Sequence, residues 1–146
     1  MSIFPTMILL ATDGSEAAEL AAQSAVQLAN ATGSELHVVL VGPSIVRQLG
    51  LVGSQHDVDL EAKRSLGAQV EKAEAAGGMF AQSHFRVGRP DREIVDLAEE
   101  IGAGLIVMGS RGLGAMSRVL MGSVSESVVR HAYCSVLVVR KEEPTD

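Results

Sequence analysis

The sequence predicts an α/β fold: a single doubly wound domain in which a five-stranded parallel sheet carries helices on both faces. Two observations support this prediction. Short runs of β-branched and aliphatic residues alternate with longer segments in which apolar residues recur at helical spacing. The resulting order, β-α-β-α-β-α-β-α-β, is typical of a parallel sheet, because each helix returns the chain to the start of the next strand.

Five segments are predicted to be strands. Most are continuous apolar runs, which suit parallel strands covered on both faces. The third is more polar and is better suited to an edge of the sheet, and the last runs from Ser135 to Arg140. In chain order the five segments are 7–12, 36–41, 81–87, 105–108 and 135–140.

Four segments are predicted to be helices, because apolar side chains recur every three or four residues and so share one face. Glycines follow the first three helices as stop signals, and Pro90 opens the third. The fourth begins near Ser123, which has the spacing of a capping box with Glu126. The apolar faces are carried by Ala17, Ala21, Ala25 and Leu28; Ala62, Leu66, Val70 and Ala73; Ile94, Leu97, Ala98 and Ile101; and Val124 and Val128.

The composition fits one globular domain spanning residues 1–146. Hydrophobic residues make up 47% of the chain and charged residues 21%, a balance that argues against disorder. A chain of 146 residues is long enough to bury its own core. We expect the ends, 1–5 and 141–146, to fray and the turn-rich segment 42–54 to form a mobile loop.

The net charge and the single cysteine limit the function classes. The net charge is −6, which argues against a broad surface for nucleic acid. Cys134 alone cannot form an intrachain disulfide or a cysteine-rich zinc site, and it favours a reducing compartment. No run approaches the roughly 20 apolar residues of a membrane-spanning helix. We therefore expect a cytoplasmic protein without nucleic-acid or membrane partners.

Unusual residues follow the first and fourth strands, at the edge where a doubly wound sheet binds its ligands. Thr12 and Asp13 follow the first strand, and a glycine-rich loop flanked by Arg111 and Arg118 follows the fourth. Glycines let a ligand approach the backbone, and the helix that starts after the loop offers free N–H groups to phosphate. The sequence favours phosphate binding here, and a plain glycine-rich connection with a capping serine is the alternative. The loop glycines are Gly109, Gly112, Gly114 and Gly122.

Two common phosphate-binding motifs do not fit this loop. A P-loop requires lysine where Ser110 stands, and the dinucleotide fingerprint must follow the first strand of the fold. The pattern that fits is Gly-x2-Gly-x9-Gly-Ser, formed by Gly109, Gly112, Gly122 and Ser123.

With this pattern the sequence resembles the universal stress protein family, in its ATP-binding class. The likeness extends over nearly the whole chain and is carried by segments 7–15, 36–39, 88–90, 105–112, 122–125 and 136–140. The resemblance implies a Rossmann-like fold of the adenine nucleotide alpha hydrolase-like type. It also implies a site for ATP, or for ADP or AMP, at the C-terminal edge of the sheet.

The resemblance assigns a role to each candidate residue. Ala11 and Thr12 would line the base, the Val38 backbone would read the adenine edge, and Asp13 would hold the ribose or the phosphates, directly or through Mg²⁺ or Mn²⁺. Met108 would contact the nucleoside. The remaining contacts would come from Gly109 at the ribose and from Gly112, Gly122, Ser123, Val124 and Ser125 at the phosphates. From its place beside the glycine-rich loop, Arg111 would add positive charge.

Some of these residues have a second interpretation. Asp13 and Ser123 can each cap the helix that follows, and capping can coexist with ligand contact. A carboxylate beside a triphosphate is repulsive unless a metal ion bridges the two or a ribose hydroxyl intervenes. We expect core or surface roles for the histidines, which lie far apart and lack metal-ligand spacing: His37, His56, His84 and His131.

If the last strand, from Ser135 to Arg140, lies at an edge of the sheet, it predicts a homodimer, which the family resemblance also implies. An exposed apolar edge strand is a liability unless it is covered, and pairing with the same strand of a second copy covers it. The leading function is a nucleotide-dependent regulator of the stress response, with a protein partner that the sequence does not name. The alternatives are a slow metal-dependent ATPase, for which no dedicated general base is seen, and an interaction module that binds no nucleotide.

Overall fold

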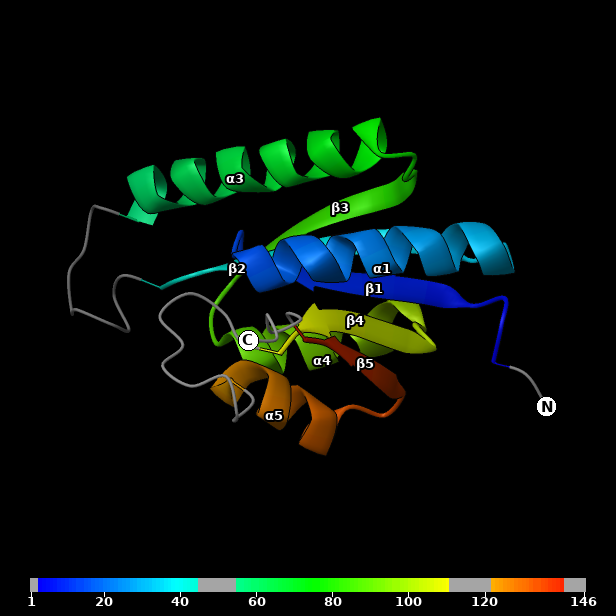
Figure 1. The fold of residues 1–146 in the computed structure, drawn as a ribbon. Helices are drawn as coiled ribbons and strands as arrows, with labels where there is room; N and C mark the ends of the chain where they lie inside the picture. Colours follow the sequence, from blue (N-terminus) through cyan, green and yellow to red (C-terminus); the bar gives the residue numbers. More distant parts are fainter. Residues whose placement is uncertain (1–2, 45–54, 111–121, 141–146) are drawn as a thin grey trace, which may run out of the picture.

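A five-stranded parallel sheet forms the centre of the computed structural model, with strand order β3-β2-β1-β4-β5 (Figure 1). The structure describes residues 3–44, 55–110 and 122–140. Its strands are β1 (Met7–Thr12), β2 (Glu35–Gly42), β3 (Phe80–Val87), β4 (Leu105–Gly109) and β5 (Ser135–Val139). Its helices are α1 (Glu16–Thr32), α3 (Gln55–Ala75), α4 (Pro90–Ile101) and α5 (Ser123–His131). The predicted fold class, the element order and the edge position of the third strand are confirmed, and β5 forms the other edge.

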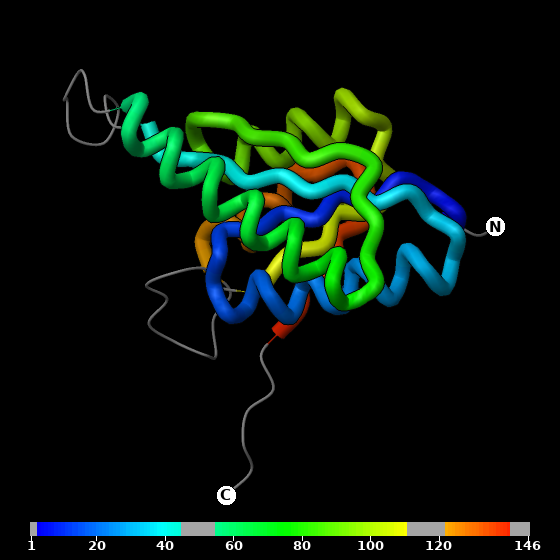
Figure 2. The backbone as a smooth tube through the Cα atoms, turned by 90° about the horizontal axis from the view of Figure 1, so that it is seen from above, coloured from blue at the N-terminus to red at the C-terminus, as the bar shows by residue number. Residues whose placement is uncertain are grey.

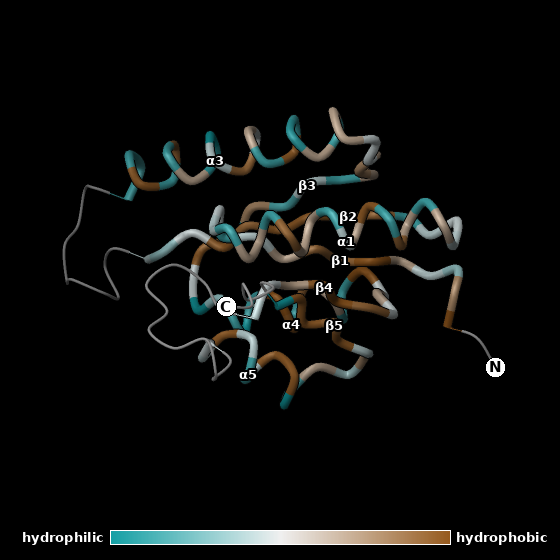
Figure 3. The backbone as a smooth tube through the Cα atoms, in the orientation of Figure 1, coloured by the Kyte–Doolittle hydropathy of each residue, from teal (hydrophilic) through white to brown (hydrophobic). Residues whose placement is uncertain are grey.

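Two hydrophobic layers enclose the sheet, because successive strand residues point to opposite faces. Ile8 and Leu10 of β1 belong to the layer under α1 and α3, which lie on the same face when viewed from above (Figure 2). Leu9 and Ala11 belong to the layer under α4 and α5. Hydrophobic colour follows β1, whereas hydrophilic and hydrophobic residues alternate along α3 (Figure 3). The continuous apolar strands of the sequence thus reflect burial on both faces.

The helix ends agree with the sequence signals, with one exception. Ser15 caps α1, where its Oγ accepts a hydrogen bond of 3.1 Å from the N–H of Ala18. Pro90 opens α4 as predicted. The predicted capping box of α5 is wrong: Gly122 is the N-cap, no side chain caps the helix, and Ser123 is already the first helical residue.

The edge strand β3 contains an irregularity that keeps its aromatic residues together. Leu36 of β2 pairs with Phe80, but His37 pairs with Gln82, so one residue of β3 is skipped. Such a bulge changes which face the following residues point to. As a result Phe80 and Phe85 both pack against the layer under α1 and α3, although alternation would place them on opposite faces.

The structure describes only part of the predicted frayed ends and loops. Within the first predicted end, Phe4 packs against the layer under α1 and α3, so it does not fray. Residues 1–2, most of the predicted loop (45–54), the core of the glycine-rich loop (111–121) and the tail 141–146 lie outside the described residues. Among the helices that the structure describes, none is long and apolar enough to cross a membrane.

Candidate functional site

The carboxyl ends of β1 and β4 form the candidate site. The strand order runs outward from β1 through β2 to β3 on one side and through β4 to β5 on the other. In doubly wound sheets the ligand crevice opens where the order reverses, which here is between β1 and β4. Thr12 and Gly109 end these two strands, so the crevice lies between the residues that follow them.

The turn after β1 holds Asp13 at the rim of this crevice. Its Oδ1 accepts a hydrogen bond of 2.9 Å from the N–H of Ser15, and Gly14 takes a positive φ of 81°. Thr12 contributes its Oγ1, which accepts from the N–H of Gly14 at 3.3 Å. Ser15 caps the helix, so the predicted capping role of Asp13 is wrong. Asp13 stabilises the turn instead, and its side chain lies at the surface.

Gly109 brings the end of β4 against the first turn of α1. A Cβ atom at this position would lie 2.8 Å from the carbonyl carbon of Ala17 and 2.9 Å from its oxygen. These are backbone atoms of a helix and cannot move aside cheaply. The glycine is therefore required by packing, in addition to any role toward a ligand.

The two ends of the glycine-rich loop are joined directly. The N–H of Gly122 donates a 2.6 Å hydrogen bond to the carbonyl of Ser110, and the buried Ser125 hydroxyl donates to the same carbonyl at 2.7 Å. The Ser125 hydroxyl also lies 3.1 Å from the carbonyl of Gly122. These contacts place the N-terminus of α5 at the end of β4.

The N-terminus of α5 supplies donors at this position. The first N–H groups of a helix have no partner within the helix, and they carry partial positive charge. In α5 these groups belong to Ser123, Val124 and Ser125. The structure thus brings three of the residues predicted to bind phosphate to the edge where the site was expected.

Asp91 fixes α5 against α4. Its Oδ2 accepts hydrogen bonds from the Ser127 hydroxyl at 2.7 Å and from Arg89 at 3.0 Å. Burial alone would raise the pKa of the Asp91 carboxyl, but these hydrogen bonds outweigh it, and the pKa lies below its usual value. The carboxylate therefore stays charged near neutral pH and anchors the helix that carries the donors.

Val38, which was predicted to contact the adenine, does not border the crevice. This residue is 1% exposed and pairs with Leu10 of β1 and with Ser83 of β3, so it lies inside the sheet. The last β2 residue opposite β1 is Leu40, whereas Val41 and Gly42 pair with β3 only. Val41 and Gly42 are therefore the β2 residues that border the crevice. Counting back from the turn that follows Gly42, instead of matching the residues around His37, would have found them.

The remaining predicted site residues differ in where they lie. Ala11 and Met108 lie near the carboxyl ends of β1 and β4, in the buried layer under α4 and α5, with exposed fractions of 6% and 5%. Arg111 and Gly112 lie outside the described residues. In the described ranges, no three His, Cys, Asp or Glu side chains gather to hold a metal ion.

Two histidines that look distant in the sequence are neighbours. His37 Nδ1 lies 3.0 Å from His84 Nε2 across β2 and β3. The core role expected of a histidine fits His37, which is buried, but nothing in the sequence indicated this contact. The Cys134 thiol is half-buried, and burial raises its pKa, which favours an inert thiol.

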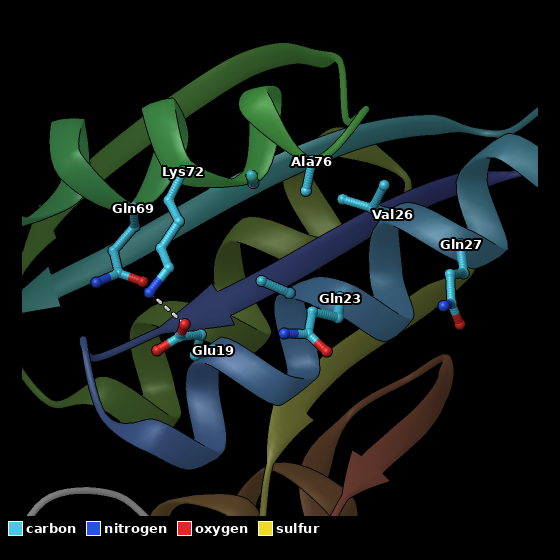
Figure 4. A pocket seen from close by; sticks show the side chains of 9 residues that line it. Glu19, Gln23, Val26, Gln27, Gln69, Lys72 and Ala76 are labelled. Atoms are coloured by element: carbon cyan, nitrogen blue, oxygen red, sulfur yellow. Dashed lines mark ion pairs between the residues drawn. The ribbon is translucent and has the colours of Figure 1, made fainter.

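A hollow of about 290 Å³ lies between α1 and α3 (Figure 4). Small side chains leave this space open: Ala22 on α1, Ala73 on α3, and Ala76 directly after α3. Glu19 and Lys72 form an ion pair across it. None of the residues predicted to bind a ligand lines this hollow.

The family of the chain is shown by comparison with known proteins. The model of the universal stress protein family matches residues 6–140. A universal stress protein of Staphylococcus aureus (strain USA300) is 40% identical over 144 residues, which cover 95% of this chain and 87% of that protein.

Two solved structures have the same fold and hold an adenine nucleotide. A universal stress protein crystallised in complex with cAMP has a TM-score of 0.74 at 27% identity, covering 97% of this chain and 100% of that one. The universal stress protein from Archaeoglobus fulgidus in complex with dAMP has a TM-score of 0.70 at 27% identity, covering 95% of this chain and 100% of that one.

Proposed function

Because the chain belongs to the universal stress protein family, we propose that it binds an adenine nucleotide between the ends of β1 and β4. The observation that carries this proposal is the 2.6 Å hydrogen bond from Gly122 to Ser110, since it holds the N-terminus of α5 at the end of β4. The cAMP and dAMP complexes of similar proteins support adenine as the base. ATP is the nucleotide we expect, with ADP and AMP as the alternatives.

The proposed contacts follow the positions of the described residues. The N–H groups of Ser123 and Val124 would bind phosphate, because they start a helix that points at the crevice. The base would lie against Ala11 and Thr12 and against the last residues of β2, with Val41 in place of Val38. Gly112 and Arg111 stay expected phosphate contacts.

Asp13 suits a metal ion that arrives with the nucleotide. Its carboxylate lies at the surface beside the crevice, and Mg²⁺ or Mn²⁺ is held by one or two carboxylates together with substrate phosphates. When bound, such an ion would offset the repulsion between the carboxylate and a polyphosphate. AMP carries a single phosphate, so its binding depends less on such an ion.

Exchanging Asp13 for asparagine tests the metal role. The asparagine oxygen can still accept from the N–H of Ser15, so the turn is retained while the charge is lost. By isothermal titration calorimetry, we expect Asp13→Asn to bind Mg²⁺·ATP at least about tenfold more weakly, or about 1.4 kcal/mol, with little change for AMP. An equal affinity of both proteins for Mg²⁺·ATP would contradict the role of Asp13.

A valine at Gly122 tests the site as a whole. Gly122 has φ −67° and ψ 158°, which valine adopts readily, so a loss of binding would report crowding of the ligand. We expect Gly122→Val to keep the wild-type melting temperature within a few degrees and to lose nucleotide binding. A folded variant that binds ATP normally would overturn the proposal.

We further propose that nucleotide occupancy regulates a stress response through a homodimer. The edge strand β5 exposes Leu137 to 37%, and a second β5 would cover it. Light scattering after size exclusion should give a dimer for the wild type and a monomer for Leu137→Lys. Val129→Lys on α5, exposed to 47%, is the matched control and should stay dimeric. Equal masses for both variants would contradict pairing through β5.

Binding, and not turnover, is the main activity in this proposal. Hydrolysis requires a positioned water and stabilisation of the charge on the γ-phosphate. Of the described residues that border the crevice as given above, only Asp13 has a charged side chain. A time course of ADP release measures the alternative of a slow ATPase, which requires the rate to fall in Asp13→Asn.

A further inference from the structure

His37 and His84 form a pair on the side of the sheet that faces α4. His37 is 5% exposed and shares its face of β2 with Val39, which belongs to the layer under α4 and α5. His37 Nδ1 lies 3.0 Å from His84 Nε2, and the two rings are nearly parallel, with an interplanar angle of 16°. One ring nitrogen must therefore donate a hydrogen bond to the other.

The second ring nitrogen of His37 identifies the donor. His37 Nε2 is buried without a hydrogen-bond partner, and Glu35 Oε1 is 3.6 Å away. A proton on Nε2 would point toward this carboxylate, whereas a bare lone pair would face its negative charge. The geometry therefore favours the tautomer of His37 with its proton on Nε2, in which Nδ1 accepts the hydrogen bond from His84 Nε2–H.

Charged groups on β3 and α4 lie near the His84 ring. Arg86 of β3 forms ion pairs with Glu93, at 3.8 Å, and with Glu100 of α4. Burial lowers the pKa of His84, and the neighbouring His37 and the positive charge of Arg86 lower it further, while Glu100 opposes them. His84 therefore resists protonation in the folded protein.

We propose that His37 and His84 are an acid-sensitive clasp that holds the edge strand β3 on β2. A neutral pair keeps the hydrogen bond, and a single added proton also keeps it, because one nitrogen can still accept. Two added protons leave an N–H group on each side of a 3.0 Å gap, so that the bond is lost and two positive charges repel each other. The clasp then opens and β3 loosens.

The direction of the pH effect follows from proton linkage. The unfolded chain takes up the proton on His84 near the ordinary value of 6.5, whereas the folded protein takes it up only at lower pH. The stabilisation is therefore complete above pH 6.5 and is lost as the pH falls below it. Because His84 takes up one proton, its own contribution raises the unfolding equilibrium constant by at most about tenfold per pH unit in this range.

The variant His84→Gln separates the clasp from other acid effects. Its side-chain amide can still donate to His37 Nδ1 but does not titrate. His131→Gln is the matched control, because His131 is exposed on α5 and lies outside the pair. Urea unfolding of the three proteins from about pH 8 to about pH 5 gives the equilibrium constants, and amide hydrogen exchange compares β3 with the central strand β1.

We expect the ratio of the wild-type to the His84→Gln unfolding constant to be flat above pH 6.5 and to rise below it. Wild-type β3 amides should lose protection in acid relative to β1, and His131→Gln should behave as wild type. Imidazole ¹⁵N spectra should place the His37 proton on Nε2. A constant ratio over the whole range, or equal protection of β3 in both proteins, would overturn the proposal.

Discussion

Replacing Ser125 with alanine distinguishes a structural role of its hydroxyl from a role in binding phosphate. The hydroxyl is 2% exposed and has one proton, which it donates to the carbonyl of Ser110 at 2.7 Å. That carbonyl keeps the N–H of Gly122, and the Gly122 carbonyl keeps the N–H of Glu126, so the variant leaves no acceptor unpaired. The cost is therefore that of one net hydrogen bond, about 1 kcal/mol.

A loss of about 1 kcal/mol corresponds to a decrease of roughly 3 °C in melting temperature for a chain of this size. It also limits the effect on nucleotide affinity to about fivefold, if the hydroxyl only holds the loop ends together. Differential scanning calorimetry and titration with ATP measure the two quantities. Ser123→Ala, at the exposed first position of α5, is the control and should melt as the wild type.

The opposite pattern would refute this reasoning. If Ser125→Ala melts at the wild-type temperature and binds ATP more than tenfold more weakly, the hydroxyl contacts phosphate and does not close the loop.

Three further predictions follow from the packing and the titrating groups. Gly109→Ala should destabilise the protein by about 1–3 kcal/mol in urea unfolding, because its Cβ would meet the Ala17 backbone; Gly67→Ala, whose Cβ would meet nothing within 4 Å, should be neutral or stabilising. Because the pKa of Asp91 is lower in the folded protein than its unfolded value of 3.8, the charged carboxylate stabilises the fold above pH 3.8, and this contribution is lost as the pH falls through the folded value. Asp91→Asn should therefore be less stable at neutral pH, and its free energy of unfolding should depend less on pH in acid. Because burial raises its pKa, the Cys134 thiol should react with a disulfide reagent more slowly than free cysteine at pH 8, until urea exposes it.

Each of these has a contrary result. Equal stability of Gly109→Ala and the wild type would mean that β4 does not pack against α1 as described. If the free energies of unfolding of Asp91→Asn and the wild type change in parallel in acid, the Asp91 carboxylate does not stabilise the fold. Immediate labelling of the native protein would show that Cys134 is accessible.

The sequence predicted the sheet well because burial on both faces leaves a direct signal in composition. Leu9 and Leu10 point to opposite layers, yet both must be apolar. Strand ends were accurate to about one residue for the same reason. What composition does not contain is the register between strands, which depends on contacts between residues far apart in the chain.

The errors in the candidate site arise from this missing register. Val38 was placed at the crevice from a local likeness, whereas its pairing with Leu10 puts it inside the sheet. The neighbours His37 and His84 are 47 positions apart, and only the register of β2 with β3 shows their contact. The capping box failed for a more local reason: Gly122 already has extended dihedral angles, so the helix begins one residue earlier than the spacing suggested.

The central position of β1 has a consequence for synthesis on the ribosome. β1 is made first, and it can pair with β2 as soon as residues 35–42 have emerged. Its other side must wait for β4, residues 105–109. Until then the chain presents an apolar strand with one unpaired side, which is the kind of surface that chaperones cover. The first strand to be made is thus among the last to be completed, and folding of the whole sheet awaits the second half of the chain.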